Sequence, residues 1–147
     1  MKILVINGPN LNMLGIREPH IYGNVTYAQL EEYIREEARK RNIEVELFQS
    51  NHEGSIIDTI QAAYQKMDGI IINPGGYTFT SIAILDALKS VSIPAVEVHI
   101  TDNMKRESFR HHSITEMACI AAIVGKGIPG YSQAMDILLE HFAKASI

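Results

Sequence analysis

The chain has 147 residues, of which 46% are hydrophobic and 20% charged, so it suits one globular domain over residues 1–147 with an ordinary apolar core. Its formal net charge of −4 argues against a nucleic-acid binder, which usually carries a basic excess. The first apolar stretch is too short for a signal peptide, and no apolar run approaches the ~20 residues of a membrane span. Cys119 is the single cysteine and sits in an apolar run, where a small buried hydrophobe is its expected role. We therefore expect a soluble cytoplasmic protein that binds neither nucleic acid nor membrane.

A predicted strand, Ile3–Asn7, opens the chain and leads into a long polar loop. Residues 7–23 read NGPNLNMLGIREPHIYG, lack helical periodicity and are interrupted by Gly and Pro. A loop of this length in a compact chain is usually functional or disordered, and this one is too rich in hydrogen-bonding groups for a spacer. Within it, Arg17 could favour the ionised form of Tyr22, which a general base requires. The residues alone favour the simpler alternative, in which Tyr22 packs the loop and Arg17 is solvated.

Short apolar runs then alternate with helical patterns. The remaining expected strands are Glu44–Gln49, Gly69–Asn73, Ala95–Ile100 and Ala118–Val124. The first helix follows Thr26, whose spacing to Gln29 fits a capping box. A second helix, from about Ser55, has one apolar stripe formed by Ile56, Ile60, Ala63, Tyr64 and Met67. A third helix runs from about Ser81 to Ser90. The last helix starts near Tyr131 and is expected to bury Ala134, Met135, Leu138, Phe142 and Ala145.

Five strand–helix repeats predict an α/β fold, with a parallel sheet covered by helices on both faces. For five strands, we expect the flavodoxin-like, doubly wound order 2-1-3-4-5. Such folds bind ligands outside the carboxyl ends of their strands. The polar residues at those ends, Asn10, Asn12, Asn73 and His99, should therefore converge.

A glycine-rich motif, Gly125–Gly130, formally matches G-x-G-x-x-G between a strand and a helix. A dinucleotide site also needs a following strand with an acid about 20 residues on. Here the sequence ends after one helix, which favours a glycine-rich turn. No G-x-x-x-x-G-K-[ST] motif occurs, so a P-loop is excluded.

Three histidines, His99, His111 and His112, raise the question of a metal site. Their spacing matches no zinc motif, so we expect neither a metal nor another cofactor. Glu97 and His99 share one strand face. Either His99 hydrogen-bonds a ligand while Glu97 orients it, or it is a satisfied core histidine.

Two further segments are candidates for ligand binding. The run from Lys105 to His112 is locally basic, and is either a solvated face or an anion or polyol site that uses Arg110. The turn after Asn73 contains Gly75, which allows close backbone approach to a ligand, although an ordinary turn has the same composition.

Five motifs occur in order along nearly the whole chain. They are Gly8-Pro9-Asn10-Leu11-Asn12 with Arg17-Glu18-Pro19 and Tyr22-Gly23; Gln49-Ser50-Asn51 with Glu53-Gly54; Asn73-Pro74-Gly75 with Tyr77-Thr78 and Thr80-Ser81; Glu97-Val98-His99; and Arg106-Glu107 with Phe109-Arg110 and His112-Ser113. Together they resemble the type II 3-dehydroquinate dehydratases. The resemblance implies a lyase of the shikimate pathway and aromatic amino acid biosynthesis, which removes water in the anti sense from 3-dehydroquinate and gives 3-dehydroshikimate through an enolate. It also implies a homododecamer built as a tetramer of trimers.

The resemblance assigns roles to individual residues. It implies that Tyr22 is the general base, Arg17 lies on a mobile lid and lowers the pKa of Tyr22, and Asn10 helps to hold a water that stabilises the enolate. It makes His99 the acid that expels the hydroxyl, supported by Glu97. Substrate-binding positions are Asn73, Gly75, Ile100 and Thr101 near the carboxylate, Arg110 at the ring hydroxyls, and Asp86, which reaches a neighbouring subunit's site.

One departure from the family pattern falls in the expected site. Phe79 occupies the position of a histidine that binds substrate hydroxyls, and a lost hydrogen bond there would cost about 1–3 kcal/mol. The alternatives are therefore a dehydratase with altered substrate binding or a flavodoxin-like binding protein. A phospho-receiver would need an acidic pair after the first strand, where Asn7-Gly8 stands, and a flavin site would need a Ser/Thr-rich phosphate loop.

Overall fold

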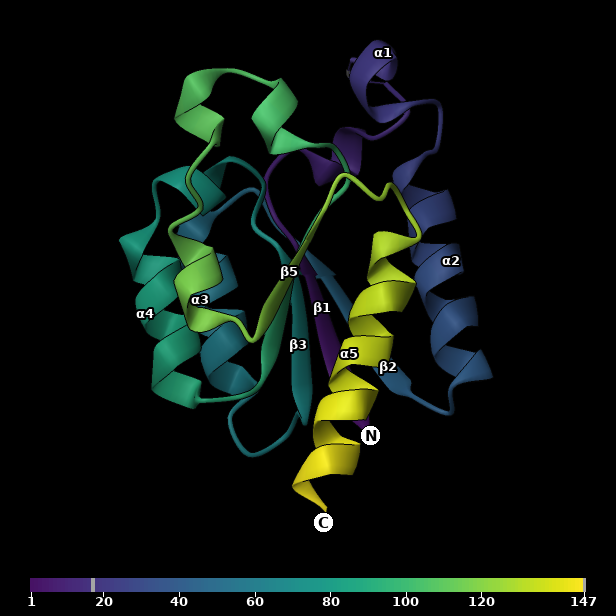
Figure 1. Cartoon of the computed structure of the whole chain (residues 1–147), viewed down its shortest axis with the longest axis vertical. Helices are drawn as coiled ribbons and strands as arrows, with labels where there is room; N and C mark the ends of the chain where they lie inside the picture. Colours follow the sequence, from purple (N-terminus) through teal and green to yellow (C-terminus); the bar gives the residue numbers. More distant parts are fainter. Residues whose placement is uncertain (17, 147) are drawn as a thin grey trace.

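The computed structural model describes residues 1–16 and 18–146, except for the side chain of Tyr22. Within them, five parallel strands form one sheet of order β2-β1-β3-β4-β5 (Figure 1). These are β1 (Lys2–Asn7), β2 (Glu44–Gln49), β3 (Gly69–Asn73), β4 (Ala95–His99) and β5 (Ala121–Val124). The expected fold class and strand order are both confirmed.

The helices cover both faces of this sheet. They are α1 (Pro19–Tyr22), α2 (Tyr27–Lys40), α3 (Glu53–Ala62), α4 (Ile82–Val91) and α5 (Gly130–Ala145). In Figure 1, α2 and α5 lie on one side of the sheet, while α3 and α4 lie on the other. No helix in the described part of the chain has both the length and the apolar character needed to cross a bilayer.

Alternating side chains of β1 divide the core into two halves. Ile3 and Val5 pack in a cluster with residues of α2 and α5, whereas Leu4 and Ile6 pack with residues of α3 and α4. This follows from the strand period of two, which sends successive side chains to opposite faces. Every residue of β3 and β4 is buried, as expected for strands covered on both faces.

The predicted cap of α2 is confirmed. The Thr26 hydroxyl accepts a hydrogen bond from the Gln29 backbone N–H at 3.1 Å, and the Gln29 side-chain carbonyl accepts one from the Thr26 N–H at 2.9 Å. This reciprocal pair satisfies two backbone donors that the first helical turn would otherwise leave free. The helix therefore begins where the sequence predicts.

Other element boundaries differ from the prediction. α3 begins at Glu53 and ends at Ala62, and Gln65 then takes a left-handed backbone with φ of 61°. The helical stripe does not extend to Tyr64, which is exposed. At the end of α5, Phe142 is only half-buried and Ala145 is exposed, because the helix runs past the sheet.

The predicted fifth strand starts too early. The segment Thr115–Ala118 forms a 3-10 turn (η5), so β5 begins only at Ala121, and Cys119 between them is half-buried rather than buried. The glycine-rich motif after β5 is a turn. Gly125 and Gly127 both have positive φ, and their N–H groups donate to the carbonyls of His99 and Ile100, which directs the chain into α5.

Short turns gather at the carboxyl edge of the sheet. They are η1 (Leu11–Met13), η2 (Gly75–Phe79), η3 (Asn103–Lys105) and η4 (Ser108–Arg110), and η1, η3, η4 and α1 are seen at the top of Figure 1. Parallel strands bring the loops that follow them to one edge. Segments far apart in the sequence therefore meet there.

Candidate active site

A cavity of about 120 Å³ opens at the carboxyl edge of the sheet. Seven of the predicted site residues that the structure describes line it: Asn10, Asn73, Gly75, His99, Ile100, Thr101 and Arg110. They come from the carboxyl ends of β3 and β4 and from the segments that follow β1, β3 and β4. The convergence expected from the strand ends is thus present for Asn10, Asn73 and His99.

The loops after β1 and β3 interlock on glycine. The Gly8 N–H donates to the Asn73 carbonyl at 2.7 Å, and a Cβ at Gly8 would stand 2.5 Å from the Pro74 carbonyl oxygen. Gly75 has a φ of +61°, and a Cβ there would stand 2.9 Å from the Pro9 carbonyl oxygen. Side chains at these positions would push the loops apart, so the two glycines allow one wall of the cavity to close.

The segment after β2 holds Asn10 in place. Asn10 has a left-handed backbone with φ of 71°, and its N–H donates to the Asn51 side-chain oxygen at 3.0 Å. The Gln49 side-chain amide donates to the same oxygen at 3.2 Å and to the Gly8 carbonyl at 3.2 Å. The Gln49-Ser50-Asn51 motif therefore supports the Asn10 loop from behind.

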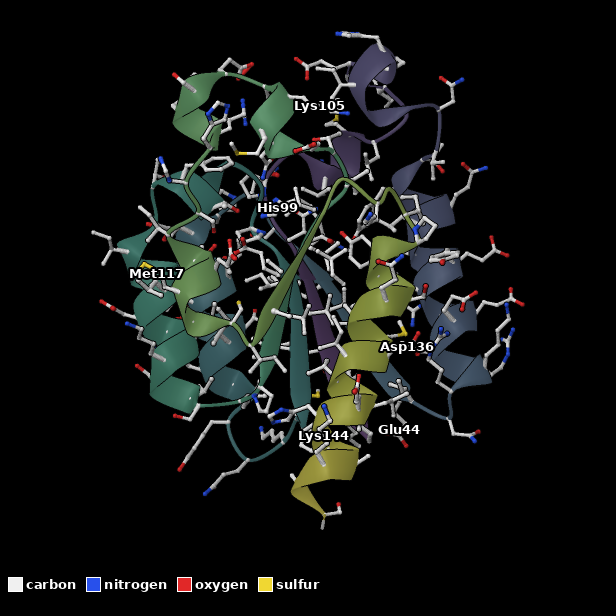
Figure 2. The ribbon with its side chains drawn as sticks, in the orientation of Figure 1. Glu44, His99, Lys105, Met117, Asp136 and Lys144 are labelled. Carbon is white, nitrogen blue, oxygen red and sulfur yellow. The ribbon has the colours of Figure 1, made fainter. Side chains whose placement is uncertain are left out.

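His99 and Glu97 form a buried hydrogen-bonded pair. His99 Nε2 lies 2.8 Å from Glu97 Oε2, and Glu97 has no exposed surface. The Glu97 carboxylate also accepts hydrogen bonds from the hydroxyls of Ser113, at 2.7 Å, and Thr115. These partners compensate its burial. Glu97, held by these hydroxyls, in turn orients the ring of His99. His99 lies at the carboxyl end of the sheet (Figure 2). Its second ring nitrogen, Nδ1, is left for a ligand.

Arg110 lies near two aromatic rings. Its guanidinium carbon is 5.9 Å from the centre of the Phe79 ring and 5.1 Å from that of Phe109. Its Nε donates to a Glu107 carboxylate oxygen at 2.5 Å, and this contact holds the pKa of Glu107 below its ordinary value. The planar guanidinium has further N–H donors on its terminal nitrogens, which suit hydroxyl or carboxylate groups.

Phe79 lines the cavity, as the resemblance implies for its position. Its ring stacks on that of His99, with centroids 6.5 Å apart and planes inclined by 22°. Phe79 thus contacts both His99 and Arg110. It supplies an apolar surface but no hydrogen-bond donor.

Several lining residues were missed by the sequence predictions. They are Pro9, Leu11, Leu14, Gly76, Asn103 and Arg106. The spacing of Leu11 and Leu14 is a helical signal that could have marked a buried turn. Arg106 occurs in a predicted motif, but its charge run also resembles a solvated face. In the structure its side chain is 11% exposed and lies 3.8 Å from the Glu18 carboxylate.

Other predicted residues stand apart from the cavity. Asp86 lies on α4, is exposed and is not among the described lining residues; Glu97 lies behind His99 rather than on the wall. The predictions for Arg17 and for the Tyr22 side chain fall outside the described residues. The Tyr22 backbone ends α1.

The described residues offer few groups for metal binding or thiol chemistry. In the part of the chain that the structure describes, no three His, Cys, Asp or Glu side chains gather as a metal site. His111 contacts the Arg106 carbonyl through Nε2 at 3.1 Å, and His112 is exposed. Burial raises the pKa of the Cys119 thiol to about 12, which keeps it from acting as a thiolate at neutral pH.

Comparison with known proteins identifies the family. Residues 1–139 match the family model described as dehydroquinase class II. A 3-dehydroquinate dehydratase of Clostridium perfringens (strain 13 / Type A) is 58% identical over 142 residues, covering 96% of this chain and 97% of its own. The crystal structure of a type II dehydroquinase from Butyrivibrio crossotus DSM 2876 has a TM-score of 0.93 at 60% identity, covering 95% of this chain and 97% of that one.

A more distant structure has the same architecture. The type II dehydroquinase of Propionibacterium acnes has a TM-score of 0.91 at 39% identity, covering 95% of this chain and 96% of that chain. The family model and the Clostridium perfringens enzyme both match nearly the whole chain. The matched region includes every residue that lines the cavity at the strand ends. The chain therefore belongs to the type II 3-dehydroquinate dehydratases, the flavodoxin-like hydro-lyases of the shikimate pathway.

Proposed function

We propose that this cavity is the site at which water is removed from 3-dehydroquinate, in the anti sense and through an enolate. The observation that carries the proposal is the convergence of Asn10, Asn73, His99 and Arg110 on one cavity, with Glu97 buried behind His99. These groups supply hydrogen-bond donors and a proton carrier in one small volume. The family's reaction requires that combination.

The wall around Asn73 suits the carboxylate of the substrate. Asn73, Ile100 and Thr101 line the cavity, and side-chain or backbone amide N–H groups at these positions would bind a carboxylate well. Gly75 has no side chain, so the η2 turn can approach Pro9 closely on this wall of the cavity. Arg110, on the opposing η4 turn, would then bind ring hydroxyls through its terminal nitrogens.

Two side chains, Tyr22 and His99, carry the proton transfers in this proposal. Tyr22, as a phenolate whose ionised form is favoured by the charge of Arg17, takes a proton from the carbon beside the ketone, and the electrons of that C–H bond form the enolate. A water held by Asn10 donates to the enolate oxygen. When the enolate collapses, the C–O bond breaks, and His99 gives a proton to the departing hydroxyl, which leaves as water. The buried Glu97 carboxylate stabilises the charged imidazolium before this transfer.

The direct test measures the product. Purified protein mixed with 3-dehydroquinate should give the ultraviolet absorbance of a conjugated enone, at a rate proportional to protein concentration. A boiled sample and a sample without substrate serve as controls. The absence of an absorbance change at high protein concentration would overturn the proposal.

A second candidate is a dehydratase whose substrate binding is altered by Phe79. The observation that favours it is the Phe79 ring in the cavity, in contact with His99 and Arg110. Phe79→His should restore a donor and lower KM for 3-dehydroquinate about 5- to 10-fold, which corresponds to about 1–1.4 kcal/mol. Steady-state kinetics would measure the change.

The matched control is Phe109→His. Phe109 contacts the same guanidinium but is 65% exposed and is not among the described cavity residues, so KM should stay within twofold. An unchanged KM in Phe79→His would show that Phe79 does not limit substrate binding. The chain would then be an ordinary dehydratase in this respect.

The family also suggests an assembly and a cellular location for this protein. We infer a dodecamer built as a tetramer of trimers, in which the exposed Asp86 of one copy reaches the cavity of a neighbour. Sedimentation analysis should give about twelve times the 16.4 kDa chain mass, and a monomer would contradict this. The cytoplasmic location would be tested by cell fractionation.

A further inference from the structure

We infer that Tyr131 is a positioning residue, whose buried hydroxyl determines which end of the Asn73 amide faces the cavity. The inference rests on the proposed function, in which Asn73 binds the substrate carboxylate. Tyr131 lies in the first turn of α5, has no exposed surface and is not among the described residues that line the cavity. It therefore acts through Asn73 rather than on the substrate.

The phenol joins two asparagines at the ends of adjacent strands. The Tyr131 hydroxyl donates to Asn7 Oδ1 at 2.6 Å and accepts from Asn73 Nδ2 at 3.4 Å. Asn7 Nδ2 in turn approaches the Tyr27 hydroxyl at 3.5 Å. Asn7 and Asn73 are register partners at the carboxyl ends of β1 and β3, and both are buried.

The hydrogen-bond pattern permits one orientation of the Asn73 amide. A phenol has a single proton, and the short contact to Asn7 uses it, so Tyr131 offers Asn73 only a lone pair. Because the Tyr131 oxygen is the acceptor in this contact, the Asn73 atom that faces it must be the donor Nδ2 and not Oδ1. Independently, the Gly75 N–H donates to Asn73 Oδ1 at 3.1 Å. Both contacts oppose a flip of the amide.

This orientation matters for an anionic ligand. The Asn73 amide nitrogen has a second N–H, which remains a donor for a carboxylate in the cavity. A flipped amide would instead present its oxygen, which repels a carboxylate. Burial raises the pKa of the Tyr131 phenol above its ordinary value, so the proton donated to Asn7 is retained at neutral pH.

Gly130, at the end of the glycine-rich motif, lets the start of α5 pack closely on the sheet beside Tyr131. A Cβ at Gly130 would lie 3.3 Å from a Val98 methyl and 3.4 Å from an Ile123 methyl, so a larger residue would crowd α5 against the sheet. The motif thus seats the N-terminal turn of α5 on β4 and β5. The phenol of Tyr131 then reaches the ends of β1 and β3.

Tyr131→Phe tests the inference. It removes only the hydroxyl, and we expect KM for 3-dehydroquinate to rise roughly tenfold, while kcat changes less than threefold. The matched control is Tyr33→Phe, which removes a half-buried hydroxyl that donates to Ser132 at 3.1 Å, and it should leave both constants unchanged. A merely structural role would lower the amount of active enzyme without this split between KM and kcat.

A double-mutant cycle makes the test specific. In an Asn73→Ala background, Tyr131→Phe should have no further effect on KM, because the group that it orients is gone. An equal rise of KM in both backgrounds would overturn the inference, as would an unchanged KM in the single variant.

Asn7→Ala provides a second route in case Tyr131→Phe does not fold. Without the acceptor at Asn7, the phenol can donate to Asn73 Oδ1 and permit the flip, so KM should again rise, although Asn7 is not among the described cavity residues. An unchanged KM in this variant would overturn the inference. An inactive wild-type protein would instead overturn the proposed function.

Discussion

Replacing Tyr22 by phenylalanine is expected to lower kcat for 3-dehydroquinate dehydration about 10²- to 10⁴-fold, the usual contribution of a general base. The ring keeps its volume and loses only the oxygen that would accept the substrate proton. KM should therefore change much less than kcat. Initial rates of enone formation over a range of substrate concentrations would separate the two constants.

The position of α1 supports this expectation. Glu18, just before α1, lies 3.8 Å from the guanidinium of Arg106, which lines the cavity. His20 and Ile21 line an adjoining hollow together with Thr101 and Arg106. The backbone of Tyr22 therefore belongs to a segment that borders the proposed site.

Tyr64→Phe is the matched control for Tyr22→Phe. Tyr64 is exposed and follows α3, near the amino-terminal ends of the strands and away from the cavity. Its variant should keep both kinetic constants. If Tyr22→Phe keeps kcat within tenfold of the wild type, Tyr22 is not the base.

The strands were predictable because the local order of polar and apolar residues determines where they form. β2 and β3 match their expected ranges to the residue, since β2 alternates polar and apolar residues and β3 is a short apolar run that Pro74 follows. Once the parallel order was expected, the edge at which Asn73 and His99 meet followed from the fold rule for strand ends. The wall formed by these strand ends therefore needed no tertiary information.

Burial at the loops was less predictable, because it depends on segments that meet only in three dimensions. Arg106 resembles a solvated charge in sequence, yet the loops around it leave its side chain largely covered. Tyr64 fits a helical stripe in sequence, but the left-handed Gln65 ends that pattern. The role proposed for Asp86 requires a second copy of the chain, which no local pattern describes.

Glu97 links the two halves of the site. Its carboxylate contacts His99 on the same strand and also Ser113 and Thr115, which follow the η4 turn that carries Arg110. The position of the Arg110 segment is thus tied to the group that orients His99. A change at Glu97 should disturb both catalysis and the packing of residues 113–115.

His99→Ala is expected to lower kcat about 10²- to 10⁴-fold, because it removes the group proposed to protonate the departing hydroxyl. His141→Ala on α5 is the control, since its ring contacts Phe142 and is not among the described cavity residues. That variant should retain the wild-type kcat. A kcat within tenfold of the wild type in His99→Ala would contradict the role of His99 as the acid.

Glu97→Gln completes the test, because it separates the chemical role of the pair from its structural role. In the wild-type background it should lower kcat, since a neutral amide stabilises the imidazolium less. In the His99→Ala background it should change kcat little, because the group it assists is absent. In both backgrounds it should reduce the free energy of unfolding by about 1–3 kcal/mol, since an amide cannot accept from Ser113 and Thr115 at both of its terminal positions. Urea unfolding would measure this loss, and an equal effect on kcat in the two backgrounds would mean that Glu97 does not act through His99.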